Sequence, residues 1–203
     1  MLQIVNAATG QWRVLFATLA GTGMRCGEAF GLHVEDVDLA GGRIYIRRSV
    51  RNGQEGSLKT AKSYREVEIE PTLVEILATH LGSRTTGRVF QTVKGTPFCR
   101  SNIRRKLNQI LKTLGLAPAG LHAFRHGRVS YLRQRGVPED LIRQWVGHSN
   151  LQTTSRYMHF DRDYRERVAL GVGLFSGINA AQKLQFSPNS PNFGSVAASE
   201  GVA

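Results

Sequence analysis

The chain has 203 residues with 41% hydrophobic composition, and its 27 Lys and Arg against 15 Asp and Glu give a formal net charge of +12 at pH 7. This imbalance favours a polyanionic partner, nucleic acid before others, although small basic proteins also carry such charge for solubility alone. The sequence lacks a signal-peptide pattern, and none of its apolar runs approaches the roughly 20 residues of a membrane span. It also lacks cysteines at zinc-like spacing. We therefore expect one soluble domain in a reducing cytoplasm, with no membrane association and no metal.

The first part of the chain is predicted to be helical. Apolar residues at Leu2, Ile4 and Val5, and again over 12–19, indicate two helices with a break at Thr9-Gly10. The second helix is expected to end at the turn formed by residues 21–23. Arg25 follows that turn, at the start of another helix.

Alternation replaces the helical period from Arg43 onward. Ile44 and Ile46 alternate with polar residues, and Val67 and Ile69 repeat the pattern, which predicts strands of a small antiparallel sheet. The turn formers between these strands are Asn52, Gly53, Gly56 and Ser57. We expect three strands in all, with Lys59 on a short middle strand or its hairpin tip.

The rest of the domain is predicted to be mostly helical. Pro71 stands in the first turn of one helix, and 101–114 forms a basic amphipathic helix with Ser101 as its N-cap. Further helices are expected over 124–135, 139–146 and 153–160. After about Gly173 the chain is rich in Gly, Ser, Asn and Ala with almost no charge, so 174–203 is interpreted as a mobile tail. The fold class is therefore α+β, mainly helical, with a small antiparallel three-stranded sheet at one edge.

Residues suited to attack on a phosphodiester gather between 122 and 157. Cleaving this bond without metal requires cations fixed around the phosphate, a nucleophile, a base and an acid. Arg125 and, upstream, Arg25 are candidates for the cations, because a guanidinium can bind two phosphate oxygens at once. Either arginine alone would equally fit a surface or backbone-phosphate contact.

The other roles have candidates in the same region. His122 stands three residues before Arg125, which places both on one face of a helical turn, whereas His126 is better suited to packing or hydrogen bonding. His148 follows an apolar helical segment in a Gly-His-Ser turn, where a helix-capping role is the alternative. Tyr157 is a nucleophile only if a base accepts its proton, and a lone tyrosine is more often a packing residue.

Five separated segments, in this order and spacing, resemble the signature of the tyrosine recombinase (phage integrase) family. They are Thr22-Gly-Met-Arg-Cys-Gly-Glu-Ala29, Leu58-Lys-Thr60, His122-Ala-Phe-Arg-His126, the stretch from Leu141 through Gly147-His-Ser149, and Arg156-Tyr157. The resemblance covers about residues 1–165 and is far more specific than any single motif. Ala123 departs from it, since many members carry an acidic residue there.

The resemblance implies a role for each matching residue. Arg25 and Arg125 would clamp the scissile phosphate with help from His148, and Tyr157 would attack it to form a 3′-phosphotyrosyl link. Lys59 would protonate the departing 5′ oxygen, with Lys62 as the alternative. His122 would be the general base toward Tyr157. Glu28 would hold a catalytic side chain in place. The family needs no metal, organic cofactor or ATP.

The same resemblance implies partners and domain limits. Residues 1–173 would be the catalytic domain of a site-specific recombinase acting on double-stranded DNA, monomeric when free and a homo-oligomer, a tetramer in synapsis, on DNA. The segment 161–173 is expected to form a short helix that docks on a neighbouring subunit. The helical N-terminal core-binding domain of the family is expected to be absent, whether by excision, truncation or as a natural short form, which predicts weak, salt-sensitive DNA binding.

Two other functions compete with strand transfer. A non-catalytic DNA-binding regulator fits the helix, turn, helix rhythm over 137–157 and the basic charge, but such a protein has no use for the combined set of catalytic residue types. Relaxation of supercoils by a related nicking mechanism uses nearly the same site, so only the products separate it from recombination. The target sequence, the direction of the reaction and any accessory proteins are left open by the sequence.

Overall fold

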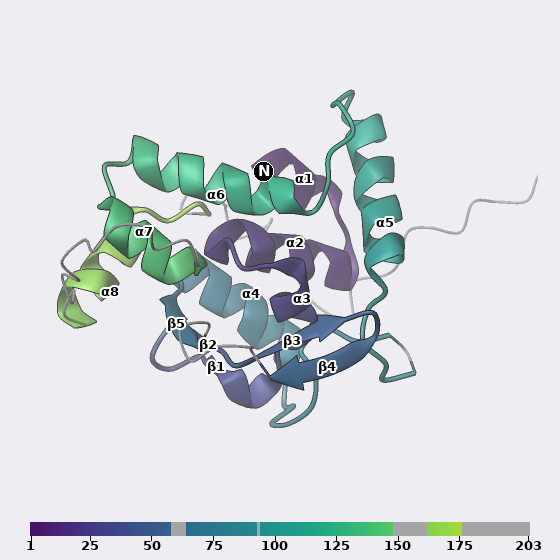
Figure 1. The fold of residues 1–203 in the computed structure, drawn as a ribbon, viewed down its shortest axis with the longest axis horizontal. Coiled ribbons are helices and arrows are strands. Elements are labelled where there is room, and N and C mark those ends of the chain that lie inside the picture. The colour runs from purple at the N-terminus through teal and green to yellow at the C-terminus, as the bar shows by residue number, and fades with distance from the viewer. Residues whose placement is uncertain (58–63, 93, 148–161, 176–203) are drawn as a thin grey trace, which may run out of the picture.

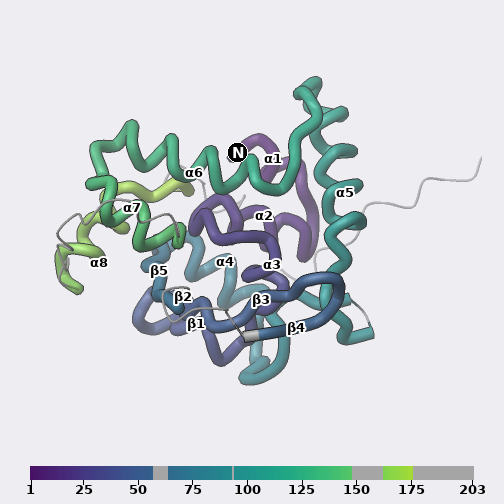
Figure 2. The backbone as a smooth tube through the Cα atoms, in the orientation of Figure 1, coloured from purple at the N-terminus to yellow at the C-terminus, as the bar shows by residue number. Residues whose placement is uncertain are grey.

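The computed structural model describes residues 1–57, 64–92, 94–147 and 162–175 (Figure 1). Helices make up most of it, and two small antiparallel sheets lie at one edge (Figures 1 and 2). The fold is thus the mainly helical α+β arrangement that the sequence predicts. None of the helices in these residues combines the length and apolarity that crossing a membrane requires.

Helix α2 (Gly10–Thr22) is the centre of the core. Its residues from Arg13 to Thr22 are all buried, and it packs against α1 (Leu2–Ala7), α4 (Pro71–Leu81) and α6 (His122–Gln134). A helix surrounded on all sides is mostly apolar all round, and the buried polar side chains of Arg13, Thr18 and Thr22 donate to backbone carbonyl oxygens. The rings of Phe16 and Phe124 stack at a centroid distance of 5.4 Å and join α2 to α6. The chain thus holds α6, which carries His122 and Arg125, directly on its most buried helix.

The predicted break and turn near α2 are confirmed. Gly10 begins α2, and Gly23 ends it in the left-handed conformation, with φ of 67°, as a helix C-cap. The chain turns there and enters α3 (Cys26–Phe30), with Arg25 as its N-cap residue. This sharp turn brings Arg25 beside the end of the central helix.

The three-stranded antiparallel sheet is confirmed, but one of its strands is not the predicted one. It consists of β1 (Val37–Asp38), β2 (Arg43–Ile46) and β5 (Arg65–Glu68) in that order, preceded by a short 3-10 helix η1 (Val34–Asp36). Ile44 pairs with Val67, and both are buried. No middle strand lies between β2 and β5, since the two pair directly, and residues 48–57 form a separate hairpin.

That hairpin consists of β3 (Arg48–Arg51) and β4 (Gln54–Ser57). Asn52 and Gly53 form its two-residue turn with φ of 51° and 78°, as the Asn-Gly pair predicts. The interpretation of Gly56 and Ser57 as turn residues was wrong, because both lie in β4 opposite β3. Lys59 and Lys62 lie outside the described residues, just beyond β4.

The later helices match their predictions with small shifts. Helix α5 (Arg100–Thr113) has Cys99 rather than Ser101 at its N-cap position, and α7 (Glu139–Val146) has the predicted bounds. The expected helix over 153–160 lies outside the described residues. Helix α8 (Arg162–Gly171) confirms the short helix predicted within 161–173, and it packs against β5 of its own chain.

The packed domain extends past the expected end at Gly173. Leu174 and Phe175 are buried, and their backbone N–H groups donate to the carboxylate of Glu70 at 2.7 and 2.9 Å. Burial raises the pKa of this carboxyl group despite the two hydrogen bonds. At least the first two residues assigned to the tail therefore belong to the core.

Candidate active site

Three arginines from distant parts of the chain converge on the C-terminal end of α7. Arg25 donates to the Gly147 carbonyl oxygen at 2.8 Å, and Arg125 donates to the same oxygen at 3.2 Å and to that of Val146. Arg65, from β5, donates its Nε to the carbonyl oxygen of Trp145 at 2.8 Å. The last carbonyls of a helix lack partners within the helix and carry its negative partial charge, so they suit cations.

Glu28 is the anion at the centre of this cluster. Its side chain is 2% exposed and contacts Arg25 at 2.9 Å and Arg65 at 2.7 Å. It also accepts the backbone N–H of Arg25 at 2.8 Å, so that it caps α3. Burial would raise the pKa of this carboxyl group, but the hydrogen bonds and charges of Arg65 and Arg25 outweigh it and hold the pKa below its usual range.

Arg125 is buried in a positively charged environment. Burial lowers the pKa of Arg125 most, and the positive charges of Arg25 and Arg65 lower it further. The negative charge of Glu28 opposes them, and the resulting pKa is about 10. It therefore stays charged at neutral pH. The Arg25 side chain is 36% exposed, so this group can meet an anion from solvent. An arriving phosphate would relieve the repulsion among the guanidinium groups and accept their remaining N–H donors.

His122 lies at the rim of the same cluster. It is exposed in the first turn of α6, and its ring packs edge-on against His126 at a centroid distance of 5.9 Å. Burial, then the positive charges of Arg125, His126, Arg100 and Arg25, lower its pKa. A lowered histidine pKa means a neutral imidazole at pH 7, which is the form that accepts a proton.

The structure thus brings together Arg25, Glu28, His122 and Arg125, four of the seven residues singled out from the sequence. Lys59, His148 and Tyr157 lie outside the described residues. In the sequence, two of them follow a described element closely, because β4 ends at Ser57 and α7 ends at Val146 with Gly147 as its C-cap.

Arg65 is the site residue that the sequence interpretation missed. A signal for it was present, because Arg65 shares the phase of Val67 and Ile69 in an alternating strand. A charged residue on the apolar face of a strand requires a buried partner. Glu28 is that partner, and no local pattern connects the two.

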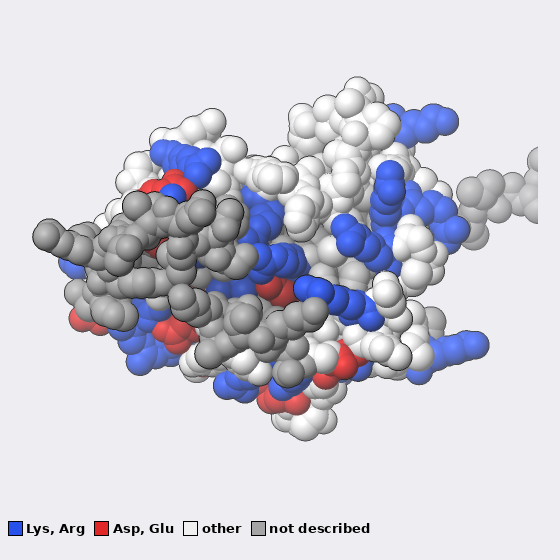
Figure 3. All heavy atoms as spheres, viewed as in Figure 1, with Lys and Arg blue, Asp and Glu red and all other residues white. Residues whose placement is uncertain are grey.

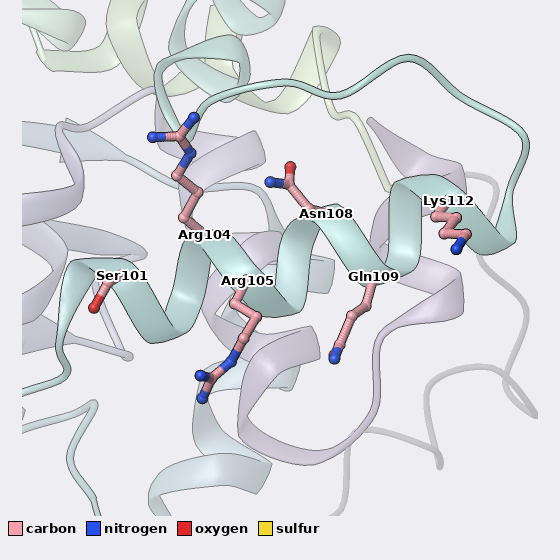
Figure 4. Close-up of a pocket in the computed structure, with 6 residues that line it drawn as sticks. All are labelled: Ser101, Arg104, Arg105, Asn108, Gln109 and Lys112. Carbon is pink, nitrogen blue, oxygen red and sulfur yellow. The ribbon is translucent and has the colours of Figure 1, made fainter.

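The exposed face of α5 carries a second group of polar and basic side chains. Its other face is buried through Ile103, Leu107, Ile110 and Leu111. An open hollow on the outside is lined by Ser101, Arg104, Arg105, Asn108, Gln109 and Lys112 (Figure 4). On the face shown in Figure 3, Lys and Arg side chains gather over the middle of the molecule and along this helix. Within the described residues, no group of three or more His, Cys, Asp or Glu side chains is placed to hold a metal ion.

Comparison with known proteins gives one consistent family. Residues 1–163 match the sequence profile of the "Phage integrase family". The "Tyrosine recombinase XerC-like" protein of Caldanaerobacter subterraneus subsp. tengcongensis is 28% identical over 72% of this chain and 45% of its own length. An "Integrase" of Streptomyces ambofaciens is 30% identical over 86% of this chain and 50% of its own length. The chain spans about half the length of the curated relatives it matches.

Solved structures agree on the fold. The crystal structure of XerA recombinase superposes with a TM-score of 0.62 at 24% identity, over 82% of this chain and 58% of that one. The Tn1549 transposon integrase, solved in complex with circular intermediate DNA, gives a TM-score of 0.61 at 19% identity, over 77% and 58%. At these identities the likeness establishes the arrangement of elements.

Proposed function

The chain belongs to the phage integrase family, and from that membership we propose that it is the catalytic domain of a tyrosine-type site-specific recombinase. It would cleave and rejoin DNA strands through a 3′-phosphotyrosyl intermediate. The observation that carries the proposal is the convergence of Arg25 and Arg125 on the Gly147 carbonyl oxygen, with His122 near enough to both for their charges to lower its pKa. That arrangement is suited to binding one phosphate group beside a neutral base.

Double-stranded DNA is the proposed substrate. The net charge of +12 and the basic outer face of α5 favour a polyanion longer than one phosphate. The side chains on this face combine cations, which bind phosphates, with Asn and Gln, which can contact phosphates or base edges. The Tn1549 transposon integrase, which has the same fold and was solved in complex with circular intermediate DNA, supports this choice.

In the proposed cleavage step, Arg25 and Arg125 bind the non-bridging oxygens of the phosphate, joined by His148. The Tyr157 hydroxyl attacks phosphorus while His122 accepts its proton, and the bond from phosphorus to the 5′ oxygen breaks. Lys59 gives its proton to that oxygen. Reversal by a 5′ hydroxyl from another strand reseals the DNA, because the phosphotyrosine retains the energy of the broken bond, so this chemistry calls for no ATP, metal or organic cofactor.

Assembly and location are further parts of the proposal. The chain would be a monomer when free and a homo-oligomer on DNA, a tetramer in synapsis, and it would act in the cytoplasm where its DNA substrate lies. Helix α8 covers β5 of its own chain through Arg165 with Glu66 and Glu68. Any docking of this segment on a neighbour would therefore have to replace these contacts or use the other face of α8.

The deciding experiment uses a suicide DNA substrate, in which a nick near the candidate site lets the short fragment that carries the released 5′ hydroxyl diffuse away and traps the covalent adduct. We expect an adduct with the native chain and none with Tyr157→Phe. Binding without any adduct, on every DNA tested, would favour the DNA-binding regulator instead. On a supercoiled plasmid that carries the site, relaxed circles without exchanged strands would favour supercoil relaxation.

The same assay separates Lys59 from Lys62. A substrate with sulfur at the 5′ bridging position has a leaving group that does not need an acid. We expect this substrate to rescue Lys59→Ala. Rescue of Lys62→Ala, with no rescue of Lys59→Ala, would reverse the assignment.

A further inference from the structure

We propose that Arg65 is a positioning residue for the reaction, a buried bridge that aligns Arg25 and the turn leading to His148. This inference rests on the proposed function. Arg65 comes from strand β5, far in sequence from both groups that it joins. It acts through its neighbours, because its side chain is 5% exposed and its contacts point into the protein.

One half of the bridge runs to Arg25 through Glu28. Arg65 donates Nη2 to Oε2 of Glu28 at 2.7 Å and Nη1 to Oε1 at 3.2 Å, so both carboxylate oxygens are engaged. Arg25 donates to the same two oxygens, through its side-chain Nη1 at 2.9 Å and its backbone N–H at 2.8 Å. A carboxylate held on both oxygens by Arg65 has one orientation, and that orientation directs the guanidinium of Arg25 toward Gly147.

The other half runs to the end of α7. The Nε of Arg65 donates to the Trp145 carbonyl oxygen. The guanidinium of Arg65 also packs closely against Gly147, because a Cβ added to this glycine would lie 2.8 Å from Nη1 and 2.9 Å from Cζ. Gly147 has φ of 68° and immediately precedes His148 in the sequence. Arg65 thus sets the position of the residue from which the chain continues to His148.

Loss of Arg65 would move the Arg25 guanidinium in a defined direction. Glu28 would keep its charge but, among the described residues, have Arg25 as its remaining cationic partner, because Arg125 reaches the carbonyl groups of Gly23, Val146 and Gly147 rather than Glu28. The Arg25 guanidinium would then be drawn toward both carboxylate oxygens and away from Gly147. A displacement of about 1 Å in a catalytic group can cost on the order of 100-fold in rate.

The test compares Arg65→Met and Arg65→Lys with Arg165→Met. Arg165 is the matched control, because it is also a nearly buried arginine, with a 10% exposed side chain, and it also pairs with carboxylates of β5. Its partners, Glu66 and Glu68, lie outside the Arg25 cluster. For each variant, thermal unfolding, the Kd for DNA and the single-turnover rate of adduct formation at saturating protein would be measured.

We expect Arg65→Met to slow adduct formation by about 10- to 100-fold with a DNA Kd within about 3-fold of native, since a misplaced clamp costs rate more than affinity. Arg65→Lys should recover part of the rate, because lysine restores the charge but not the paired donors. Arg165→Met should lose stability without losing rate in the folded fraction. Equal rate losses for Arg65→Met and Arg165→Met would overturn the proposal.

A second readout is independent of activity. In NMR spectra of the arginine Nε–Hε groups, Arg65→Met should shift and broaden the Arg25 signal and leave that of Arg128, whose guanidinium lies elsewhere against the Val172 carbonyl, unchanged. An unchanged Arg25 signal would overturn the bridge even if the native chain cleaves DNA. A changed Arg25 signal in a chain that forms no adduct would keep the bridge and refute only the proposed function.

Discussion

Replacing Gly27 by alanine tests how closely the β3–β4 hairpin, which precedes Lys59 in the sequence, packs on α3, the helix whose N-cap is Arg25. Gly27 lies in the first turn of α3, and a Cβ there would lie 2.8 Å from both the backbone oxygen of Val50 and Oγ of Ser49. The serine hydroxyl can rotate away. The Val50 oxygen belongs to β3, so the hairpin must move by about half an ångström to reach ordinary contact.

The magnitude follows from two opposing effects. Overpacking of this kind costs about 1–3 kcal/mol, whereas alanine gains up to ~1 kcal/mol over glycine in a helix. A net loss of about 1 kcal/mol corresponds to a Tm lower by roughly 2–4 °C in a domain of this size. Thermal and urea unfolding would measure it.

Two other glycines make a graded control series. Gly31→Ala would place its Cβ 3.2 Å from the backbone of Arg48 and Ser49, and should cost less. Gly171→Ala, in α8 with open space around it, should be neutral or stabilising. If Gly27→Ala were as stable as Gly171→Ala, the close packing of α3 on β3 would not constrain the hairpin.

The same variant has a functional consequence under the proposed mechanism. A displaced hairpin would carry the segment containing Lys59 away from the leaving group, so adduct formation on normal DNA should slow while the 5′-thio substrate reacts at a near-native rate. Equal slowing on both substrates would refute this explanation and point to a disturbance at Arg25 instead.

The remaining predictions concern the nucleophile, the base, the tail and the DNA-binding face. Tyr157→Phe should abolish the adduct in denaturing gels while DNA affinity in filter binding changes by less than about 2-fold, because a hydroxyl group makes a small share of the phosphate contacts. Since the pKa of His122 is lowered, the midpoint of the acid-side fall in the adduct rate should lie below the ordinary histidine pKa of about 6.5, and a midpoint above it would contradict a base at this position. Phe175→Ala, at a fully buried ring, should cost about 3–5 kcal/mol in urea unfolding, whereas Leu170→Ala at a 61% exposed side chain should cost under about 0.5 kcal/mol. Arg104→Ala should weaken DNA binding and reduce the slope of log K against log salt by about 1, and an unchanged slope would remove α5 from the DNA interface.

Local patterns accounted for most of the elements and for the family assignment. The apolar period identified the helices, the alternation around Ile44 and Val67 identified two paired strands, and the Asn52-Gly53 pair identified a hairpin turn. These features depend on residues a few positions apart, where backbone geometry dictates which side chains share a face. The motifs around Arg25 and Arg125 could be assigned to a family for the same reason, because each is short and contiguous.

Tertiary structure decided what depends on distant partners. Arg65 is recognised as a site residue only from the fold, which places β5 beside Glu28 and the end of α7. Strand β1, too short to show alternation, pairs with β2, and Phe175 is buried with its backbone N–H donated to Glu70. A buried charge or backbone N–H requires a partner, and that partner can come from any part of the folded chain. The partner therefore cannot be identified from the residues next to the buried group in sequence.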